Sequence, residues 1–157
     1  MKVSARTTQN SQDSVRTVAC DASFDITTGT GVWGWTDCCG VVWTEAGEAK
    51  SSSLCELKAV VRALEAHTSG SQLLLKIDYK PLAEVVAALA TNCEVRAWPS
   101  VATNVETNAL WLSLVRLVKI LNVTATWVPG HEGDELHQVI DRATRAQLRL
   151  SRTGTPY

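Results

Sequence analysis

Four carboxylates and one histidine are the residues of this chain that could do chemistry. His131 follows a Trp-Val-Pro-Gly sequence, which is typical of a strand ended by a turn, and Asp141 comes ten residues later within a predicted helix. Asp21 lies inside an otherwise apolar stretch, and Asp78 ends another one. A charged side chain in either place is costly unless it is paired or bound to a cation.

Glu56 lies on a predicted helix beside apolar neighbours and completes the group of four acids. Any single acid has a simple structural explanation, such as capping a helix or lying at a solvent edge. Four like charges together instead need a divalent cation, and oxygen ligands with room for water suit Mg²⁺ or Mn²⁺. Two such ions about 4 Å apart can activate a water and stabilise the leaving oxygen in phosphodiester hydrolysis. His131 could then move protons or help to release product, and the less favoured alternative is a histidine that is merely exposed in a turn.

The elements that must position these residues follow from hydrophobic periodicity and turn residues. Three short β-rich runs joined by Gly-containing turns predict an antiparallel meander, and helices alternate with two further strands after it. The expected strands cover residues 17–24, 32–36, 41–44, 72–78 and 123–128, and the expected helices cover 51–67, 80–90, 109–121 and 134–150. This order predicts an α/β fold, a five-stranded mixed sheet flanked by helices.

Two local features of this pattern concern helix ends. Ser53 with Glu56 three residues later fits a capping box at the start of the first helix. His67 ends the same helix, where it is expected to interact with the helix dipole.

Trp98 is expected to fold back from a loop onto the helices, and the other five tryptophans lie in apolar runs that predict core positions.

Composition limits the possible classes of protein. A chain of 157 residues, 45% hydrophobic and 20% charged, suits one soluble domain, expected over residues 15–150 between a polar tail (1–14) and a frayed end (151–157). The net charge of -1 excludes a global basic field that would recruit nucleic acid. Five scattered cysteines without paired spacing indicate reduced thiols in the cytoplasm. The first residues lack an apolar segment, so no signal peptide is expected, and no apolar run is long enough to span a bilayer.

In its motifs and their order, the chain resembles ribonuclease H of the bacterial type 1 family over roughly residues 16–150. Each matching piece is short, but their order and spacing agree with the family throughout. The pieces are Asp21-Ala22-Ser23, Gly31-Val32-Trp33-Gly34, Glu56-Leu57-Lys58-Ala59-Val60, Ala63-Leu64-Glu65, Leu75-Lys76-Ile77-Asp78, the helix of Trp111, Trp127-Val128-Pro129-Gly130-His131, and Asp141.

The resemblance implies a ribonuclease H-like fold and a metal-dependent endonuclease. Such an enzyme hydrolyses the RNA strand of RNA–DNA hybrids and leaves 5′-phosphate ends. The resemblance further implies that Asp21, Glu56, Asp78 and Asp141 ligate two Mg²⁺ ions, which Mn²⁺ can replace. It makes His131 the mobile proton carrier. The implied partner is the hybrid substrate, with no membrane, and the protein is expected to act as a monomer.

Substrate contacts are expected near the acids. RNA is distinguished by its 2′-hydroxyls in a wide minor groove, which small polar side chains can touch. The candidates are Ser23, Ser51, Ser52 and Ser53, with Lys80 as a phosphate contact. The chain departs from the family, which usually has Asn at positions 52, 53 and 137, Ser at 79 and Gln at 80.

Two further function classes stay open beside this one. Many relatives carry a Lys-rich handle interleaved with Trp, whereas residues 94–99 here hold one basic residue, which predicts weak, salt-sensitive substrate binding. Another nuclease on the same fold, an exonuclease or a junction resolvase, would be separated by comparing substrates. A catalytically silent nucleic-acid-binding module would be favoured by loss of an acid, but all four are present.

Overall fold

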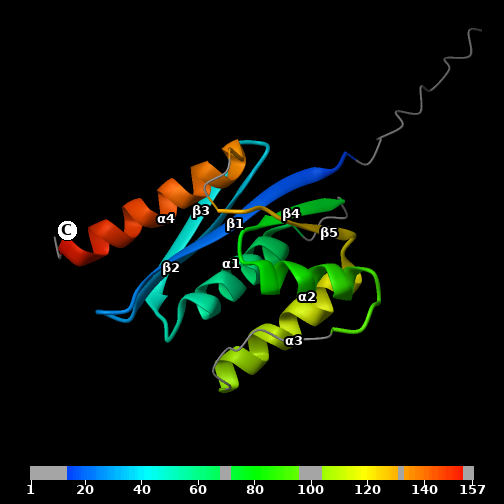
Figure 1. Ribbon diagram of the computed structural model, residues 1–157, viewed down its shortest axis with the longest axis horizontal. Helices are drawn as coiled ribbons and strands as arrows, with labels where there is room; N and C mark the ends of the chain where they lie inside the picture. The colour runs from blue at the N-terminus through cyan, green and yellow to red at the C-terminus, as the bar shows by residue number, and fades with distance from the viewer. Residues whose placement is uncertain (1–13, 68–71, 96–103, 131–132, 154–157) are drawn as a thin grey trace, which may run out of the picture.

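The computed structural model describes residues 14–67, 72–95, 104–130 and 133–153 (Figure 1). Five strands and four helices lie within these residues. In chain order they are β1 (Arg16–Asp25), β2 (Thr30–Asp37), β3 (Val42–Glu48), α1 (Ser52–Ala66), β4 (Leu73–Ile77), α2 (Lys80–Ala90), α3 (Val105–Ile120), β5 (Val123–Trp127) and α4 (Glu135–Thr153). None of these helices is both long and apolar enough to cross a bilayer.

The five strands form one mixed sheet in the order β3-β2-β1-β4-β5. β1 pairs with β2 and β2 with β3 in antiparallel register, so the predicted meander is confirmed. β4 pairs with β1 and β5 with β4 in parallel register, each after a helical connection. The predicted α/β fold, a five-stranded mixed sheet flanked by helices, is therefore confirmed.

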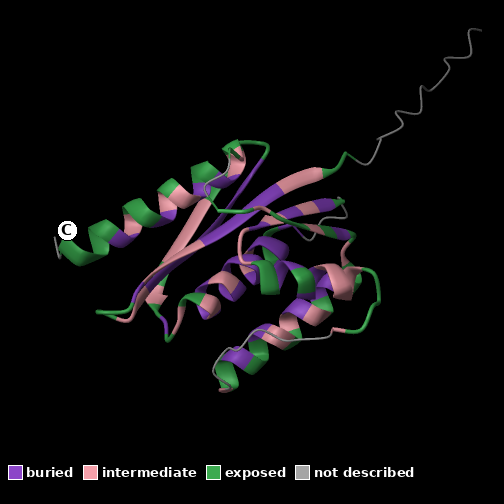
Figure 2. Cartoon of the chain, viewed as in Figure 1, coloured by how far each residue is buried: buried purple, intermediate pink, exposed green. Residues whose placement is uncertain are grey.

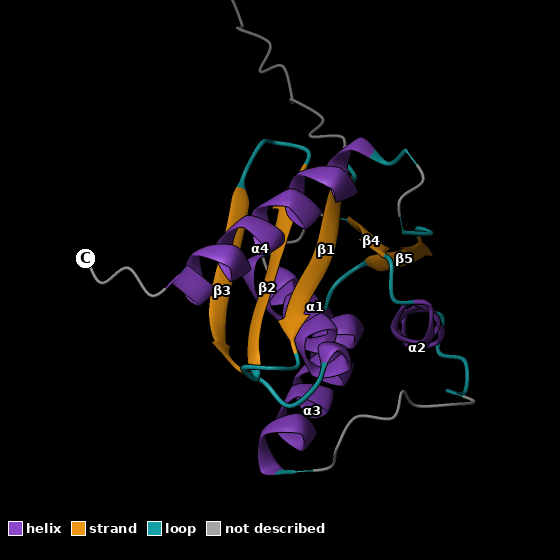
Figure 3. Ribbon diagram, turned by 60° about the vertical axis from the view of Figure 1, so that its left-hand side comes forward, coloured by secondary structure: helices purple, strands orange, loops and turns teal. Residues whose placement is uncertain are grey.

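Helices cover both faces of this sheet (Figure 3). α4 packs across β1, β2 and β3 on one face, whereas α1 packs on β1 and β2 from the other face. α3 lies against α1, and α2 contacts β4, β5 and α3. The main core lies between the sheet and α1, where most of the helix is buried (Figure 2).

Two glycines of β2 allow α1 and α4 to come close to the sheet. Because Gly31 and Gly34 are three residues apart in one strand, they face opposite sides of the sheet. A Cβ at Gly31 would collide with the sulfur of Cys55 on α1. A Cβ at Gly34 would collide with the backbone oxygen of Trp43 and lie 3.0 Å from Cδ1 of Ile140 on α4. These two positions therefore set how near each helix lies to the middle of the sheet.

The starts of two helices differ from the prediction. Ser51, not Ser53, is the N-cap of α1, and its hydroxyl accepts a hydrogen bond from the backbone N–H of Leu54 at 3.2 Å. The capping box predicted at Ser53 is wrong because the helix already begins at Ser52, which places Ser53 in its first turn. α3 begins at Val105, four residues before the expected start, because Asn104 provides a side-chain cap.

The C-terminal helix is longer than expected. α4 continues to Thr153, three residues beyond the expected end at 150. Arg152 in its last turn donates a hydrogen bond through Nε to Oδ2 of Asp25 at 2.7 Å, which ties the end of α4 to the end of β1. Residues 1–13 of the expected tail (1–14), Trp98 and residues 154–157 lie outside the described residues.

Asp37 closes the turn between β2 and β3. Its Oδ1 accepts hydrogen bonds from the backbone N–H groups of Cys39 and Val41, each at 3.0 Å, and its Oδ2 lies 3.5 Å from Nε2 of His67. His67 is buried and its Nδ1 contacts the Ala63 carbonyl in the last turn of α1 at 2.7 Å, as expected for a residue at this helix end. Burial alone would raise the pKa of Asp37, but the two N–H donors and His67 hold it below its ordinary value.

Replacing Asp37 with Ala should lower the free energy of unfolding by roughly 2 to 4 kcal/mol, because several donors lose a buried acceptor. Since the pKa of Asp37 is lowered by folding, its contribution is fully present above the unfolded pKa of about 4 and is lost as the pH falls further. Urea unfolding of both proteins between pH 7 and pH 3 measures this. Equal stability at pH 7 would contradict the assigned role of Asp37.

Candidate active site

Two of the predicted acids lie side by side because of the strand register. β1 and β4 run parallel with Cys20 opposite Ile77. The residue that follows each member of this pair is an aspartate, Asp21 within β1 and Asp78 directly after β4. Parallel neighbours place both carboxylates at the same level of the sheet, so their proximity follows from the register alone.

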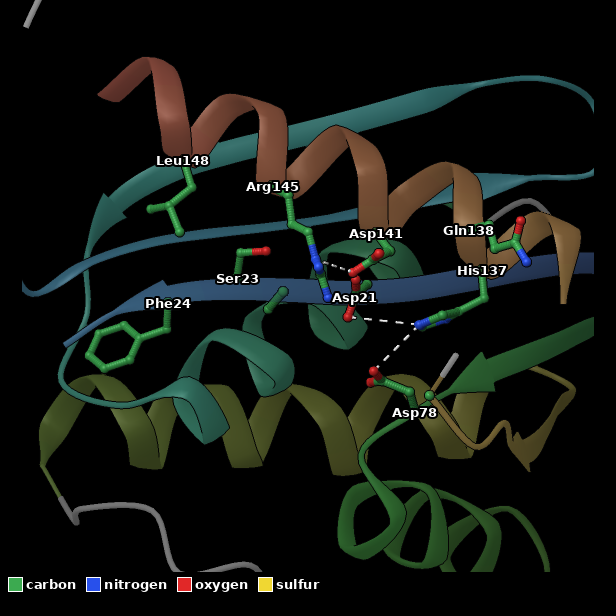
Figure 4. Close-up of a pocket in the computed structure, with 11 residues that line it drawn as sticks. Asp21, Ser23, Phe24, Asp78, His137, Gln138, Asp141, Arg145 and Leu148 are labelled. Atoms are coloured by element: carbon green, nitrogen blue, oxygen red, sulfur yellow. Dashed lines mark hydrogen bonds and ion pairs between the residues drawn. The ribbon is translucent and has the colours of Figure 1, made fainter. Parts of the chain in front are cut away.

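α4 brings two more groups to these aspartates (Figure 4). His137 and Asp141 are four residues apart and therefore lie on one face of the helix. Nε2 of His137 lies 3.4 Å from Oδ2 of Asp78 and 3.9 Å from Oδ1 of Asp21. Asp141 lies one turn further along and adds to the negative potential at Asp21.

Glu56 approaches from the opposite face of the sheet, on the second turn of α1. Burial, followed by the charges of Asp78 and Asp21, raises the pKa of Glu56 well above its ordinary value, although the backbone N–H of Ala22 offsets part of this. The four predicted acids therefore act on one another electrostatically, as they must if they share a site. They come from β1, α1, the end of β4 and α4.

The cluster carries more negative charge than its surroundings can neutralise. Asp21 is 2% exposed, and burial together with repulsion from Asp78 raises its pKa to about 7 despite the opposing charge of His137. One carboxylate oxygen each of Asp21, Glu56 and Asp78 is buried and accepts no hydrogen bond within the described part of the chain. Unpaired buried oxygens of this kind fit a bound divalent cation.

His137 can carry positive charge next to the acids when its imidazole is protonated. Burial alone would lower the pKa of its imidazole, but hydrogen bonding to Asp78 and the charges of Asp21 and Asp141 raise it above the ordinary value. Arg145 does the same for the fourth acid, because its Nε donates to Oδ1 of Asp141 at 2.8 Å. A histidine and an arginine of α4 thus lie directly against the acids.

The beginning of α4 is fixed to the strand that leads to Asp78. Oδ1 of Asp134 accepts a hydrogen bond from the backbone N–H of His137 at 2.8 Å, and its Oδ2 accepts one from Lys76 of β4. Burial alone would raise the pKa of Asp134, but Lys76 and the His137 N–H hold it below its ordinary value. This bond pair places the first turn of α4, and with it His137, next to Asp78.

Trp127 holds the backbone at Asp78, which corrects the prediction that this residue belongs to the core. Its side chain is 43% exposed, because β5 lies at the edge of the sheet. The indole Nε1 donates to the Asp78 carbonyl at 3.0 Å, and Nζ of Lys80 lies 5.1 Å from the ring centroid. Trp33 and Trp35 are buried as predicted.

The predicted substrate-binding residues lie in different settings, and Ser23 is the one among them that lines the pocket with the acids. Ser23 is hydrogen-bonded to Thr144 of α4 at 3.1 Å, and Ser53 donates to the hydroxyl of Tyr79 at 3.3 Å. Ser51 caps α1, Ser52 is exposed, and Lys80 lies 3.9 Å from Glu84. His131 lies outside the described residues.

An open pocket of about 360 Å³ lies beside three of the four acids. Asp21, Asp78, His137, Asp141 and Arg145 line it, and Ser23, Phe24 and Leu148 extend it along β1. The carboxylates have the donor chemistry that Mg²⁺ and Mn²⁺ prefer, and the opening leaves room for water and a substrate. Cys20 lies buried beneath the cluster, and burial with the nearby acids raises the pKa of its thiol, which keeps it neutral.

His137 and Arg145 belong to the site but do not stand out in the sequence. Both lie in a predicted helix among other polar residues. Their spacing of four residues on either side of Asp141 was the available signal, because it places all three on one helix face.

Comparison with known proteins identifies relatives of this chain. The sequence profile of the RNase H family matches residues 13–149. Ribonuclease H of Anaeromyxobacter sp. (strain K) is 28% identical over 112 residues, which cover 70% of this chain and 61% of that protein. Ribonuclease H of Xanthomonas campestris pv. campestris (strain 8004) is 29% identical over 110 residues, covering 69% of this chain and 73% of that protein.

A third relative, ribonuclease H of Methylorubrum extorquens (strain PA1), is 27% identical over 116 residues, covering 73% of this chain and 51% of that protein. The chain thus spans about three fifths of the length of the Anaeromyxobacter relative and about half of the Methylorubrum one. The profile, however, matches from before β1 to within α4 and so includes all four acids. The chain therefore belongs to the ribonuclease H family.

Proposed function

We propose that this protein is a metal-dependent endonuclease that hydrolyses the RNA strand of RNA–DNA hybrids and leaves 5′-phosphate ends. The observation that supports this most directly is the convergence of four carboxylates from four elements around unpaired buried oxygens. The names of the relatives point to the same activity. A binding module without catalysis would have no use for a charge cluster that is costly to bury.

The residues that would hold two Mg²⁺ or Mn²⁺ ions are Asp21, Glu56, Asp78 and Asp141. When bound, such ions supply an activated water and neutralise the charge that develops on the leaving oxygen. Asp21 and Asp78 act from rigid strand positions, which fixes their carboxylates relative to each other. Arg145 holds the carboxylate of Asp141 at the rim of the pocket. His131 carries the proton to or from the leaving group in this proposal.

Recognition of the hybrid uses small polar groups next to the acids. Ser23, Ser51, Ser52 and Ser53 would contact the backbone of the duplex and the 2′-hydroxyls, which distinguish RNA from DNA. Lys80 would contact a phosphate. Within the described residues, the one ion pair of Lys80 is with Glu84 at 3.9 Å, and both side chains are exposed, so Lys80 can turn toward a phosphate at little cost.

A comparison of substrates tests the proposal. A hybrid labelled with a different dye on each strand is incubated with Mg²⁺, Mn²⁺ or EDTA, beside single-stranded RNA, duplex RNA and duplex DNA. We expect metal-dependent shortening of the hybrid's RNA strand alone, and products that a 5′-phosphate-dependent exonuclease degrades. Cleavage of another substrate would indicate a different nuclease of this fold, and binding without cleavage would indicate the silent module.

We further propose that residues 15–150, together with the end of α4, form the catalytic domain, and that residues 1–14 and 154–157 lie outside it. The protein is proposed to act as a monomer in the cytoplasm. Sedimentation measurements at working concentration test the oligomeric state. A truncation that removes residues 1–14 and retains hybrid cleavage would support the domain boundary.

A further inference from the structure

His137 lies where a ligand of a metal ion would lie. One oxygen of Asp21, one oxygen of Asp78 and one ring nitrogen of His137 all lie within 4.8 Å of one another. The side chain of His137 comes from α4, opposite the two aspartates, so the three atoms approach one point from different directions (Figure 4).

The distances fit a single ion. For bonds of about 2.1 Å in octahedral geometry, neighbouring ligand atoms lie about 3 Å apart and opposite ones about 4.2 Å apart. The separations from Nε2 of His137 are 3.4 Å to Asp78 and 3.9 Å to Asp21, between these two values. The two aspartates therefore lie at ligand-like distances from His137, and all three ligand atoms lie within 4.8 Å of one another, close enough to share one ion after small side-chain adjustments.

The imidazole is held in this position by the fold. The backbone N–H of His137 donates a hydrogen bond to Asp134, and Lys76 of β4 donates another to the same carboxylate. His137 is only 6% exposed. Asp21 is only 2% exposed, and its buried Oδ2 accepts no hydrogen bond within the described residues. The site thus offers a fixed nitrogen together with a buried oxygen that needs a positively charged partner.

We propose that Nε2 of His137 ligates the divalent ion held by Asp21 and Asp78, and that this nitrogen makes the site favour Mn²⁺ and Co²⁺ over Mg²⁺. Mg²⁺ is bound almost entirely by oxygen, whereas imidazole suits transition metals, whose affinity rises from Mn²⁺ to Co²⁺. The inference rests on the proposed function only in that Asp21 and Asp78 bind a divalent cation.

Pulsed electron paramagnetic resonance of the Mn²⁺-loaded protein tests this without measuring activity. We expect a ¹⁴N coupling of the imidazole type in the wild type and its loss in His137→Asn, which keeps a polar side chain of similar reach. His67→Asn, at a buried histidine remote from the site, is the matched control and should keep the coupling. Calorimetric titration should show that His137→Asn lowers Mn²⁺ affinity roughly 10- to 100-fold and Mg²⁺ affinity much less.

Each outcome distinguishes the inference from the function on which it rests. A wild-type protein that cleaves hybrid but shows no nitrogen coupling would overturn the ligand role of His137 and leave the nuclease proposal standing. A coupling that survives in His137→Asn would also overturn it, because the nitrogen would then come from another histidine. If neither Mn²⁺ binding nor cleavage is found in the wild type, both proposals fail together.

Discussion

Replacing Asp21 with Asn is expected to reduce metal-dependent cleavage of an RNA–DNA hybrid by about three orders of magnitude or more. The change removes the charge of the most buried acid in the cluster while preserving its shape. A loss of that size corresponds to roughly 4 kcal/mol of transition-state stabilisation, within the range expected when a ligand of a catalytic metal loses its charge. Initial rates under saturating Mg²⁺ or Mn²⁺ measure it.

Asp25→Asn is the matched control, because Asp25 is buried on the same strand and bonded to Arg152 away from the pocket. Its cleavage rate should stay within about twofold of the wild type, although its stability will fall. Retention of activity in Asp21→Asn would show that the cluster is not the catalytic centre.

The Asp21→Asn variant should be more stable than the wild type when no metal is present. The pKa of Asp21 is raised to about 7 in the folded protein. The protonated carboxyl group of Asp21 therefore contributes fully to stability below about pH 4, and this contribution is lost as the pH rises through 7. Asn carries no such charge, so at pH 8 in EDTA we expect a gain on the order of 2 kcal/mol. Mn²⁺ should then stabilise the wild type and have little effect on the variant.

Replacing Gly34 with Ala is expected to destabilise the fold by roughly 3 kcal/mol and to remove most hybrid cleavage. The added methyl group would collide with the β3 backbone at Trp43 and press against Ile140 of α4. Gly34 pairs directly with Asp21, and Asp141 follows Ile140, so moving α4 changes the distance between two of the acids. Urea unfolding and hybrid cleavage on the same preparation measure both effects.

Gly47→Ala, on β3 of the same sheet, is the control for adding a methyl group to a strand glycine. The atoms nearest to its added Cβ would belong to the Trp33 side-chain ring, the first of them at 3.1 Å. The loss of stability and activity should be clearly smaller than for Gly34→Ala. Equal effects of the two changes would mean that the position of α4 relative to Asp21 is not what Gly34 protects.

The acids could be predicted from the sequence because their setting is visible in one dimension. Asp21 interrupts an apolar strand and Asp78 ends another, so the cost of burial points to function before any contact is known. Glu56 and Asp141 were less exceptional as helix residues. Their place in the site depends on how closely α1 and α4 approach the sheet, which the glycines of β2 determine.

The misplaced features depend on tertiary position. Trp127 lies in an apolar run like the buried tryptophans, but its strand is the edge of the sheet and leaves the ring exposed. Three consecutive serines have the same capping chemistry, so the sequence alone did not distinguish Ser51 from Ser53. The role of His137 depends on the packing of α4 over β1, which brings the His137 ring close to both Asp21 and Asp78.

Anomalous X-ray scattering from crystals grown with Mn²⁺ tests the central claim most directly, because it locates the ion without reference to activity. We predict an anomalous peak within bonding distance of the carboxylates of Asp21 and Asp78, with Glu56 and Asp141 around it. A map with no peak at these carboxylates, in crystals saturated with Mn²⁺, would contradict the assignment of this cluster as a metal centre.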